Sequence, residues 1–409
     1  MGLVDLLPKK SRRLQDSPAV GPLRGELLGT DRLVERAQEL SRVQTLDTQR
    51  APTRDAPLLV RLDDTRRVLA EAQELLADAV AREVDVGPAA AWFLDNYYVV
   101  QEHMREVRES LPRGYYQELP RLSAGPLAGY PRVYELATTL ISHTEARVDL
   151  DNVEAFVRAF QDERPLSIGE LWSVPAMLRL ALIESVRRMT LRTVERLAEV
   201  ENADRRGASL LAADEESVGG LAAAVSEFVK NPPRLTPTFV TRFLYFLRES
   251  RADHPALIEL ERWIGRKGLR AELASRRSTQ HAAITQIIIA NSITSLRAIG
   301  RLDWKLFVER QSSIDVVLRQ DPAGYYERMT FATRDHYRHV IETIAKRSGL
   351  AESMVAAHAI RLAARPEMRG RRTHVGFFLV DDGLAELETA CQFRPSAAEQ
   401  ARRLLLRQP

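Results

Sequence analysis

The sequence of 409 residues contains a single cysteine, Cys391, and therefore cannot form an intramolecular disulfide. This excludes a disulfide-stabilised scaffold and favours a reducing compartment, of which the cytosol is the simplest. An excess of one charge is also lacking, because 59 Lys and Arg residues face 56 Asp and Glu residues, for a net charge of +3. So small a net charge over this length argues against nucleic acid as a partner.

Long hydrophobic runs are also missing. No run reaches the roughly 18 consecutive apolar residues that would span a bilayer. The most apolar stretch, Ile284–Ile293, is interrupted by Thr285, Gln286, Asn291 and Ser292. The N-terminal residues carry no apolar segment behind their basic ones, unlike a secretory signal. We therefore expect no membrane span and no secretory signal in this chain.

The sequence lacks the common motifs of nucleotide and hydrolase sites. The patterns G-x-x-x-x-G-K-[ST], G-x-G-x-x-G and G-x-S-x-G do not occur. Asp149 and Asp151 have the D-x-D spacing that can hold a divalent cation, but they precede an amphipathic run and are better explained as a helix cap. His336, His339 and Glu342 fit a helix face that contacts a partner better than a metal site, because Arg334 and Arg338 nearby would oppose a cation. We predict no catalytic, cofactor-binding or metal-binding residue.

Apolar residues recur with helical spacing in almost every segment, whereas the period-2 alternation of strands is nearly absent. Apolar residues make up 45% of the chain and charged residues 28%, which is typical of a packed soluble protein and not of a disordered one. The pattern predicts an all-α fold, either a multi-helix bundle or an array.

Changes in composition predict how the chain is divided. Residues 205–220 are small, polar and acidic, which is typical of a linker. They separate an N-terminal helical subdomain at 25–204 from a C-terminal one at 221–365. Residues 1–24 are expected to form a flexible tail, and residues 366–409 an extended segment followed by a basic tail.

The extended segment is predicted at His374–Gly383, the one part of the chain without helical periodicity. It joins β-branched and aromatic residues in a short run that ends at glycine. Such a run is typical of extended structure, and it can cross a surface without joining a sheet.

Within a helix predicted from about Ala89 to Val107, the stretch Trp92–His103 mixes four large aromatics with polar and acidic side chains. The favoured interpretation is a packed, hydrogen-bonded core helix in which Trp92 is an anchor, as Trp172 is in a later helix. The alternative is a helix that faces a ligand. With the tyrosine pairs described next, it defines a possible interaction surface: Trp92, Asp95, Asn96, Tyr97, Tyr98, Glu102, Tyr115, Tyr116, Tyr325 and Tyr326.

The pattern P-x-G-Y-Y occurs twice, at Pro112–Tyr116 and at Pro322–Tyr326. The simpler interpretation is a turn that leads into a helix, in which Pro and Gly stop one helix and the tyrosines anchor the next. In the other interpretation, the tyrosines form a platform for carbohydrate or for a protein partner.

Several long motifs, in the same order, resemble the N-terminal cytosolic region of bacterial cyclic β-1,2-glucan synthases. The first is WFLDNYYVVQEHMREVRESLPRGYYQELPRL at 92–122. Weaker similarity begins near Gly25 and continues through 58–80, so the resemblance covers nearly all of the chain except its first twenty or so residues and the predicted linker. The other strong motifs occupy residues 125–137, 165–184, 291–297, 303–319, 331–350 and 374–383.

This resemblance implies a very large inner-membrane parent protein. Its glycosyltransferase module polymerises glucose from UDP-glucose, with a divalent cation, and later modules close the ring and trim the chain length. By this resemblance the present chain is a truncated or separately encoded region that holds none of those modules. The basic residues Arg402, Arg403 and Arg407 look like the cytoplasmic flank of a first membrane span.

Two functions from different classes follow. In the first, the chain is a non-catalytic region at the cytoplasmic face of the inner membrane. It would support the glycosyltransferase and membrane modules of the same polypeptide or of a neighbouring chain. In the second, it is a stand-alone helical module for binding or oligomerisation that contacts carbohydrate or a protein partner through exposed aromatics. An autonomous enzyme is not favoured, because no acid, base or nucleophile constellation assembles at the level of motifs.

Overall fold

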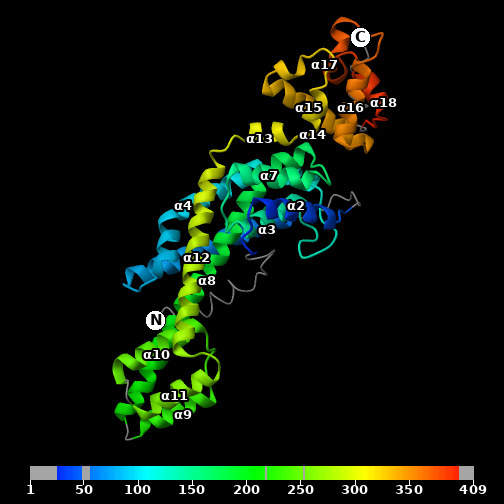
Figure 1. Cartoon of the computed structure of the whole chain (residues 1–409). Helices are drawn as coiled ribbons and strands as arrows, with labels where there is room; N and C mark the ends of the chain where they lie inside the picture. Colours follow the sequence, from blue (N-terminus) through cyan, green and yellow to red (C-terminus); the bar gives the residue numbers. More distant parts are fainter. Residues whose placement is uncertain (1–24, 48–55, 217–218, 252–253, 396–409) are drawn as a thin grey trace.

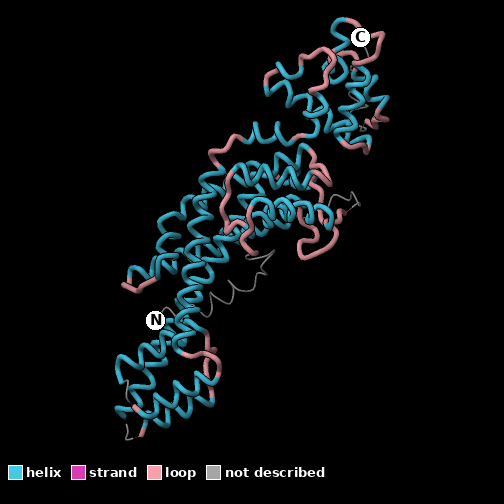
Figure 2. Tube along the Cα trace, in the orientation of Figure 1, coloured by secondary structure: helices cyan, strands magenta, loops and turns pink. Residues whose placement is uncertain are grey.

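A computed structural model describes residues 25–47, 56–216, 219–251 and 254–395. Across these residues the chain forms α-helices, two short 3₁₀ turns and two isolated β-bridges, but no strand. The predicted all-α fold is therefore confirmed (Figure 2). The predicted N-terminal tail and the basic residues near the C-terminus lie outside the described residues.

The helices form an elongated array in three parts, and two long helices run from one end group through the central body (Figure 1). The long helices are α8 (Ile168–Glu216) and α12 (Ala271–Ile299). A central body surrounds the first part of α8 and the second half of α12. Its other helices are α2 (Thr30–Val43), α3 (Pro57–Ala81), α4 (Gly87–Ser110), α5 (Arg113–Glu118), α6 (Arg132–His143) and α7 (Leu150–Gln161).

The two ends of the array are smaller groups of helices. At one end, the last turns of α8 and the start of α12 pack with α9 (Gly220–Lys230), α10 (Pro237–Arg251) and α11 (Pro255–Arg266). At the other end lie the C-terminal elements. These are α13 (Trp304–Gln311), α14 (Ser313–Leu318), η1 (Tyr326–Arg328), α15 (Phe331–Ser348), α16 (Glu352–Ala363), η2 (Gly370–Thr373), α17 (Val375–Val380) and α18 (Leu384–Ala390).

Local sequence sets many of the helix ends. Proline begins α3, α10 and α11, where its missing N–H costs nothing. The side chain of Asp149 accepts a hydrogen bond from the backbone N–H of Asn152 and so caps α7. Gly349 ends α15 with a positive φ of 78°, the left-handed conformation that glycine adopts without strain.

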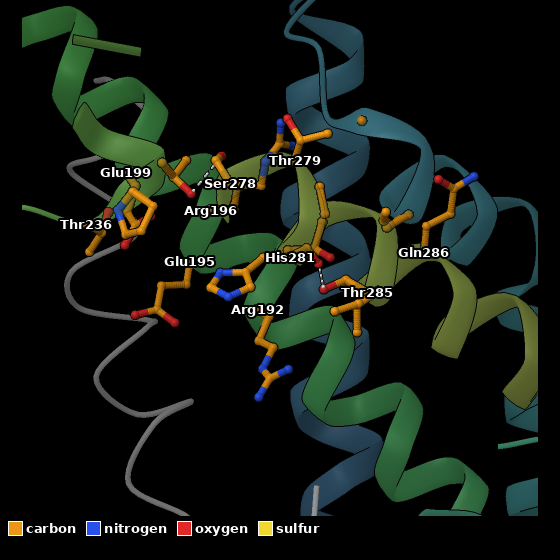
Figure 3. A pocket seen from close by; sticks show the side chains of 18 of the residues that line it. Arg192, Glu195, Arg196, Glu199, Thr236, Ser278, Thr279, His281, Thr285 and Gln286 are labelled. Carbon is orange, nitrogen blue, oxygen red and sulfur yellow. Dashed lines mark hydrogen bonds between the residues drawn. The ribbon is translucent and has the colours of Figure 1, made fainter. Parts of the chain in front are cut away.

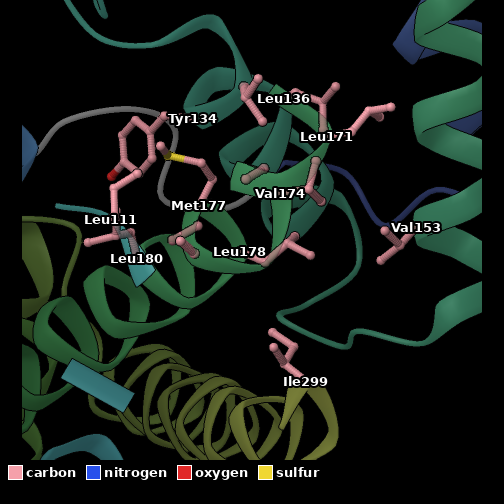
Figure 4. Close-up of a cluster of buried hydrophobic side chains, with 14 of the residues drawn as sticks. Leu111, Tyr134, Leu136, Val153, Leu171, Val174, Met177, Leu178, Leu180 and Ile299 are labelled. Carbon is pink, nitrogen blue, oxygen red and sulfur yellow. The ribbon is translucent and has the colours of Figure 1, made fainter. Parts of the chain in front are cut away.

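The central body is held together by the apolar face of α8. Leu171, Val174, Met177 and Leu178 are buried there, and Ile299 of α12 belongs to the same cluster of buried side chains (Figure 4). Burying a side chain of this size stabilises the fold by roughly 1.5–3 kcal/mol. The cluster therefore makes α8 the common packing surface for the neighbouring helices.

The predicted linker at 205–220 is wrong, because α8 continues without a break to Glu216. Alanine and other strong helix formers there favour a helix despite the acidic composition, and the buried Leu210 gives this stretch an apolar face. Gly207 lets α10 come close, since a Cβ atom at this position would lie 2.5 Å from the ring of Phe246. The break falls later, at Gly219, whose φ is 85°.

Buried residues also group differently from the two predicted subdomains. One cluster joins side chains from residues 33–197 with others from 288–391. A second, smaller cluster is confined to residues 203–274. The chain thus leaves the central body along α8, forms the small end group, and returns along α12.

The predicted extended segment at His374–Gly383 is also wrong. Its middle forms the helix α17, and Val375, Phe377, Phe378 and Leu379 are all buried. A six-residue apolar run gives no periodicity that separates a buried strand from a buried helix. Burial on several sides at once explains why this segment looked like a strand.

Among the described residues, α12 is long and apolar enough to cross a membrane by length and composition, with a hydropathy of 1.3 over its most apolar 18 residues. However, 44% of this 18-residue stretch is buried inside the protein. The core helix of a soluble protein can have the same length and composition. The absence of a membrane span thus remains a prediction.

Candidate functional site

The aromatic helix, α4, presents two different faces. Phe93, Asn96 and Tyr97 are buried against neighbouring helices, whereas Trp92 and Tyr98 are 41% and 61% exposed. Of the remaining members of the predicted interaction surface on this helix, the acidic residues Asp95 and Glu102 are also exposed. The interpretation of Trp92 as a core anchor is therefore wrong. The anchor is its neighbour Phe93, which lies about 100° further round the helix and is fully buried.

Trp172, the other predicted anchor, is half-buried on α8. Its ring meets that of Phe331 of α15 edge-on, with centroids 6.1 Å apart. An edge-to-face contact of this kind stabilises a pair by about 0.5–1.5 kcal/mol beyond its buried area. Trp172 thus links the central body to the C-terminal helices.

The contrast between Phe93 and its neighbour gives a direct prediction. We expect Phe93→Ala to reduce the free energy of unfolding by about 3–5 kcal/mol, because it leaves a cavity in the core. Trp92→Ala should cost less than about 1 kcal/mol, since much of its ring already contacts water. Chemical denaturation of both variants measures the difference. Equal losses would show that Trp92 is a packing residue after all.

The polar residues of α4 make contacts between helices. The side-chain amide of Asn96 donates to the carbonyl of Trp92, and its oxygen accepts from Arg297 of α12 at 2.7 Å. The same Arg297 nitrogen donates to the hydroxyl of Tyr98 at 3.1 Å. Asn96 and Tyr98 therefore fasten α4 to α12.

The two P-x-G-Y-Y patterns place their second tyrosine alike and their first tyrosine differently. The second tyrosine of each pair, Tyr116 or Tyr326, is fully buried. Tyr115 is half-buried and donates a hydrogen bond to the carbonyl of Gly169, whereas Tyr325 is 58% exposed. In both cases the turn leads into a short helical segment, α5 or η1. This agrees with the simpler interpretation of a reused turn, and the predicted aromatics do not come together in one platform.

The two faint metal patterns have structural partners. Asp149 accepts from both the backbone N–H and the side-chain amide of Asn152, at 2.8 and 2.5 Å. Glu342 pairs with Lys346 at 2.8 Å, and Nδ1 of His339 lies 2.8 Å from the carbonyl oxygen of Asp335. Over the described part of the chain, no three His, Cys, Asp or Glu side chains are grouped so that they could hold a metal ion.

Deeply buried charges join helices that are distant in the sequence. Arg132 of α6 pairs with Glu170 of α8 at 2.5 Å, and both are almost completely buried. Arg61 of α3 pairs with Glu184 of α8 at 2.7 Å. Removing one member of such a pair typically costs about 3–5 kcal/mol, because the other charge remains buried without compensation. These charges are used in structural contacts.

The largest cavity described here was not found by sequence reasoning. It is a cleft of about 770 Å³ where α8, α10 and α12 meet the beginning of α4 (Figure 3). Four separate segments line it, so no local motif marks it: 86–89, 192–199, 234–238 and 278–286. One signal was present, because charged residues of α8 recur at spacings of three and four. These are Arg192, Glu195, Arg196 and Glu199.

Charge in the cleft is only partly balanced. Glu195 of α8 lies 3.5 Å from Arg234. Glu199 has its pKa raised, first by burial, although side-chain hydrogen bonds with Thr236 and Thr238 oppose the shift. Arg192 and Arg196 have no carboxylate partner among the described residues. The arrangement provides two guanidinium groups that no described carboxylate pairs with, beside several hydroxyls.

Taken together, the chain is an all-α helical array with a charged cleft between its long helices. No family model matches it. It is 33% identical over 329 residues to the cyclic β-(1,2)-glucan synthase NdvB of Rhizobium meliloti (strain 1021), a match that covers 78% of this chain. The chain is therefore related to the cyclic β-(1,2)-glucan synthases. The match covers 11% of the length of that synthase.

Proposed function

We propose that this chain is a non-catalytic helical region of a cyclic β-(1,2)-glucan synthase and supports a membrane-embedded glycosyltransferase that polymerises glucose from UDP-glucose. Its partners in this proposal are the transferase and membrane modules, on the same polypeptide or on a neighbouring chain. UDP-glucose as a donor and a divalent cation are assigned to the transferase. The region is proposed to lie at the cytoplasmic face of the bacterial inner membrane.

The observation that carries this proposal is that the buried charged side chains pair with one another between helices. Ion pairs such as Arg132–Glu170 and Arg61–Glu184 connect α8 to helices that precede it by many residues. The D-x-D aspartate, Asp149, is occupied as a helix cap. Side chains placed this way connect the helices of the array to one another, which suits a supporting role beside a larger catalytic module.

The alternative, a stand-alone binding module, would rely on exposed aromatics. Trp92 and Tyr98 are exposed on α4, but Tyr98 is tied to Arg297. Tyr325 belongs to the C-terminal helices and packs edge-on against His374. This scattered placement favours the supporting role.

A radiolabel assay tests the non-catalytic role. We expect the purified chain neither to hydrolyse UDP-glucose nor to transfer glucose when Mg²⁺ or Mn²⁺ is added, because Asp149 already accepts two hydrogen bonds from Asn152. Turnover that disappears in an Asp149→Ala, Asp151→Ala variant would contradict the proposal.

The supporting role is tested in a full-length synthase that carries this region. Phe93→Ala should reduce glucan output together with the amount of folded protein, and Trp92→Ala provides the matched control. If glucan output is unchanged after the region has unfolded or been deleted, the region gives no support to the transferase.

A further inference from the structure

The cleft between α8, α10 and α12 carries more positive charge than its carboxylates neutralise. Arg234 and Glu195 offset one another. Arg192 and Arg196, one helical turn apart on α8, are left without a carboxylate partner among the described residues. Glu199 is the other carboxylate among the described residues that line the cleft. Arginine side chains that outnumber the carboxylates of a cleft are suited to an anion.

Arg196 adds a second observation. Its Nε atom is enclosed by protein and has no hydrogen-bond partner within the described structure. Its Nη1 atom lies against the backbone of Gly87, since a Cβ atom there would be 3.1 Å away. An enclosed donor without an acceptor costs about 1–3 kcal/mol. A ligand oxygen that accepts from this guanidinium would remove that cost.

The size and the other lining groups define the class of ligand. A volume of about 770 Å³ lies within the usual range of small-molecule sites, roughly 300–1,000 Å³. Hydroxyls from Thr236, just before α10, and from Ser278 of α12 line the same cleft (Figure 3). We propose that the cleft binds a small organic phosphate of about the size of a sugar phosphate. Its phosphate group contacts Arg192 and Arg196, and its hydroxyls meet the hydroxyl-rich walls.

Glu199 is compatible with this ligand. Burial favours its neutral form, and hydroxyls of Thr236 and Thr238 interact with it. A protonated carboxyl can donate a hydrogen bond to a phosphate or sugar oxygen. Even with Glu199 and Glu195 counted, the three arginines that line the cleft, Arg192, Arg196 and Arg234, outnumber its carboxylates.

The proposal is independent of the supporting role. A region that supports a transferase can bind a phosphate compound or bind none, and titration of the purified chain does not depend on glucan output. Failure of either proposal thus leaves the other standing.

Isothermal titration of the whole chain tests the cleft with three probes: glucose 1-phosphate, inorganic pyrophosphate and glucose. We expect glucose 1-phosphate to bind, pyrophosphate to compete with it, and glucose to bind far more weakly. Binding should weaken as salt is added, because the contacts are ionic. Equal binding of glucose and glucose 1-phosphate would overturn the proposal, as would the absence of binding by both phosphate probes.

Variants locate the site. Arg192→Gln and Arg196→Gln should each weaken glucose 1-phosphate about tenfold or more, which is the loss expected for one charge-assisted hydrogen bond. Arg105→Gln, at an exposed position on α4, is the matched control and should bind like the unmodified chain. Arg192 is itself exposed, so its variant tests binding even if Arg196→Gln fails to fold. Unchanged affinity in Arg192→Gln would place any phosphate binding elsewhere.

Discussion

Replacing Arg338 with methionine should reduce the free energy of unfolding by about 3–5 kcal/mol. Arg338, on α15, is completely buried. Its guanidinium lies 3.3 Å from both Asp315 and Glu309, and it stacks over the ring of Phe331. Methionine preserves most of the side-chain volume but leaves the buried Asp315 carboxylate without its cation. The loss is large relative to the ~5–15 kcal/mol that stabilises a typical domain. Chemical denaturation measures it.

A second substitution separates charge from packing. Asp315 also accepts a hydrogen bond from the Tyr326 hydroxyl at 2.7 Å. Asp315→Asn keeps that acceptor and removes the charge, so the double variant with Arg338→Met should recover more than half of the lost stability. The double variant removes both charges of the pair, so it leaves no buried charge without a partner. If the double variant is no more stable than Arg338→Met alone, the loss comes from packing and not from an uncompensated charge.

Helical periodicity was sufficient to predict the all-α fold, because an amphipathic pattern records which face of each helix is buried. Local signals also worked: Asp149 caps α7, and Gly349 ends α15. These features depend on neighbours within one or two turns. A single sequence contains that information directly.

The failures share a physical origin in tertiary packing. Residues 205–216 look like a linker by composition, yet they extend α8 because α10 packs against them. Val375–Val380 looks like a strand because it is buried on several sides. Trp92 and Phe93 are adjacent aromatics, and only the positions of α3, α8 and α12 decide which is buried. The cleft was missed for the same reason, since its walls come from four distant segments.

Glu352 should make the protein less stable as the pH rises. One oxygen of its carboxyl accepts a hydrogen bond from the backbone N–H of Ile168, at the first turn of α8. Burial, and to a smaller extent the nearby Glu342 and Glu170, raises its pKa from 4.5 to about 7. This carboxyl therefore joins α16 to the beginning of α8, in a buried position that disfavours its ionised form.

The sign of the pH effect follows from which state holds the proton. Below about pH 4.5, both folded and unfolded chains are protonated at Glu352, and there is no penalty. Between that pH and about 7, the unfolded chain loses its proton first, so stability falls as the pH rises. Above the folded-state pKa the penalty is complete, and the shift corresponds to about 3 kcal/mol.

Glu352→Gln is the decisive variant, because its amide oxygen can still accept from Ile168 but cannot ionise. Near about pH 8 it should be more stable than the unmodified chain by up to about 3 kcal/mol, and near about pH 4 the two should be equal. Glu102→Gln, at an exposed position on α4, is the control and should change stability little at either pH. Denaturation curves recorded across this pH range give the comparison. A stability difference that does not vary with pH would mean that the Glu352 carboxyl remains ionised in the folded protein and that its contact with α8 is an ordinary charged helix cap.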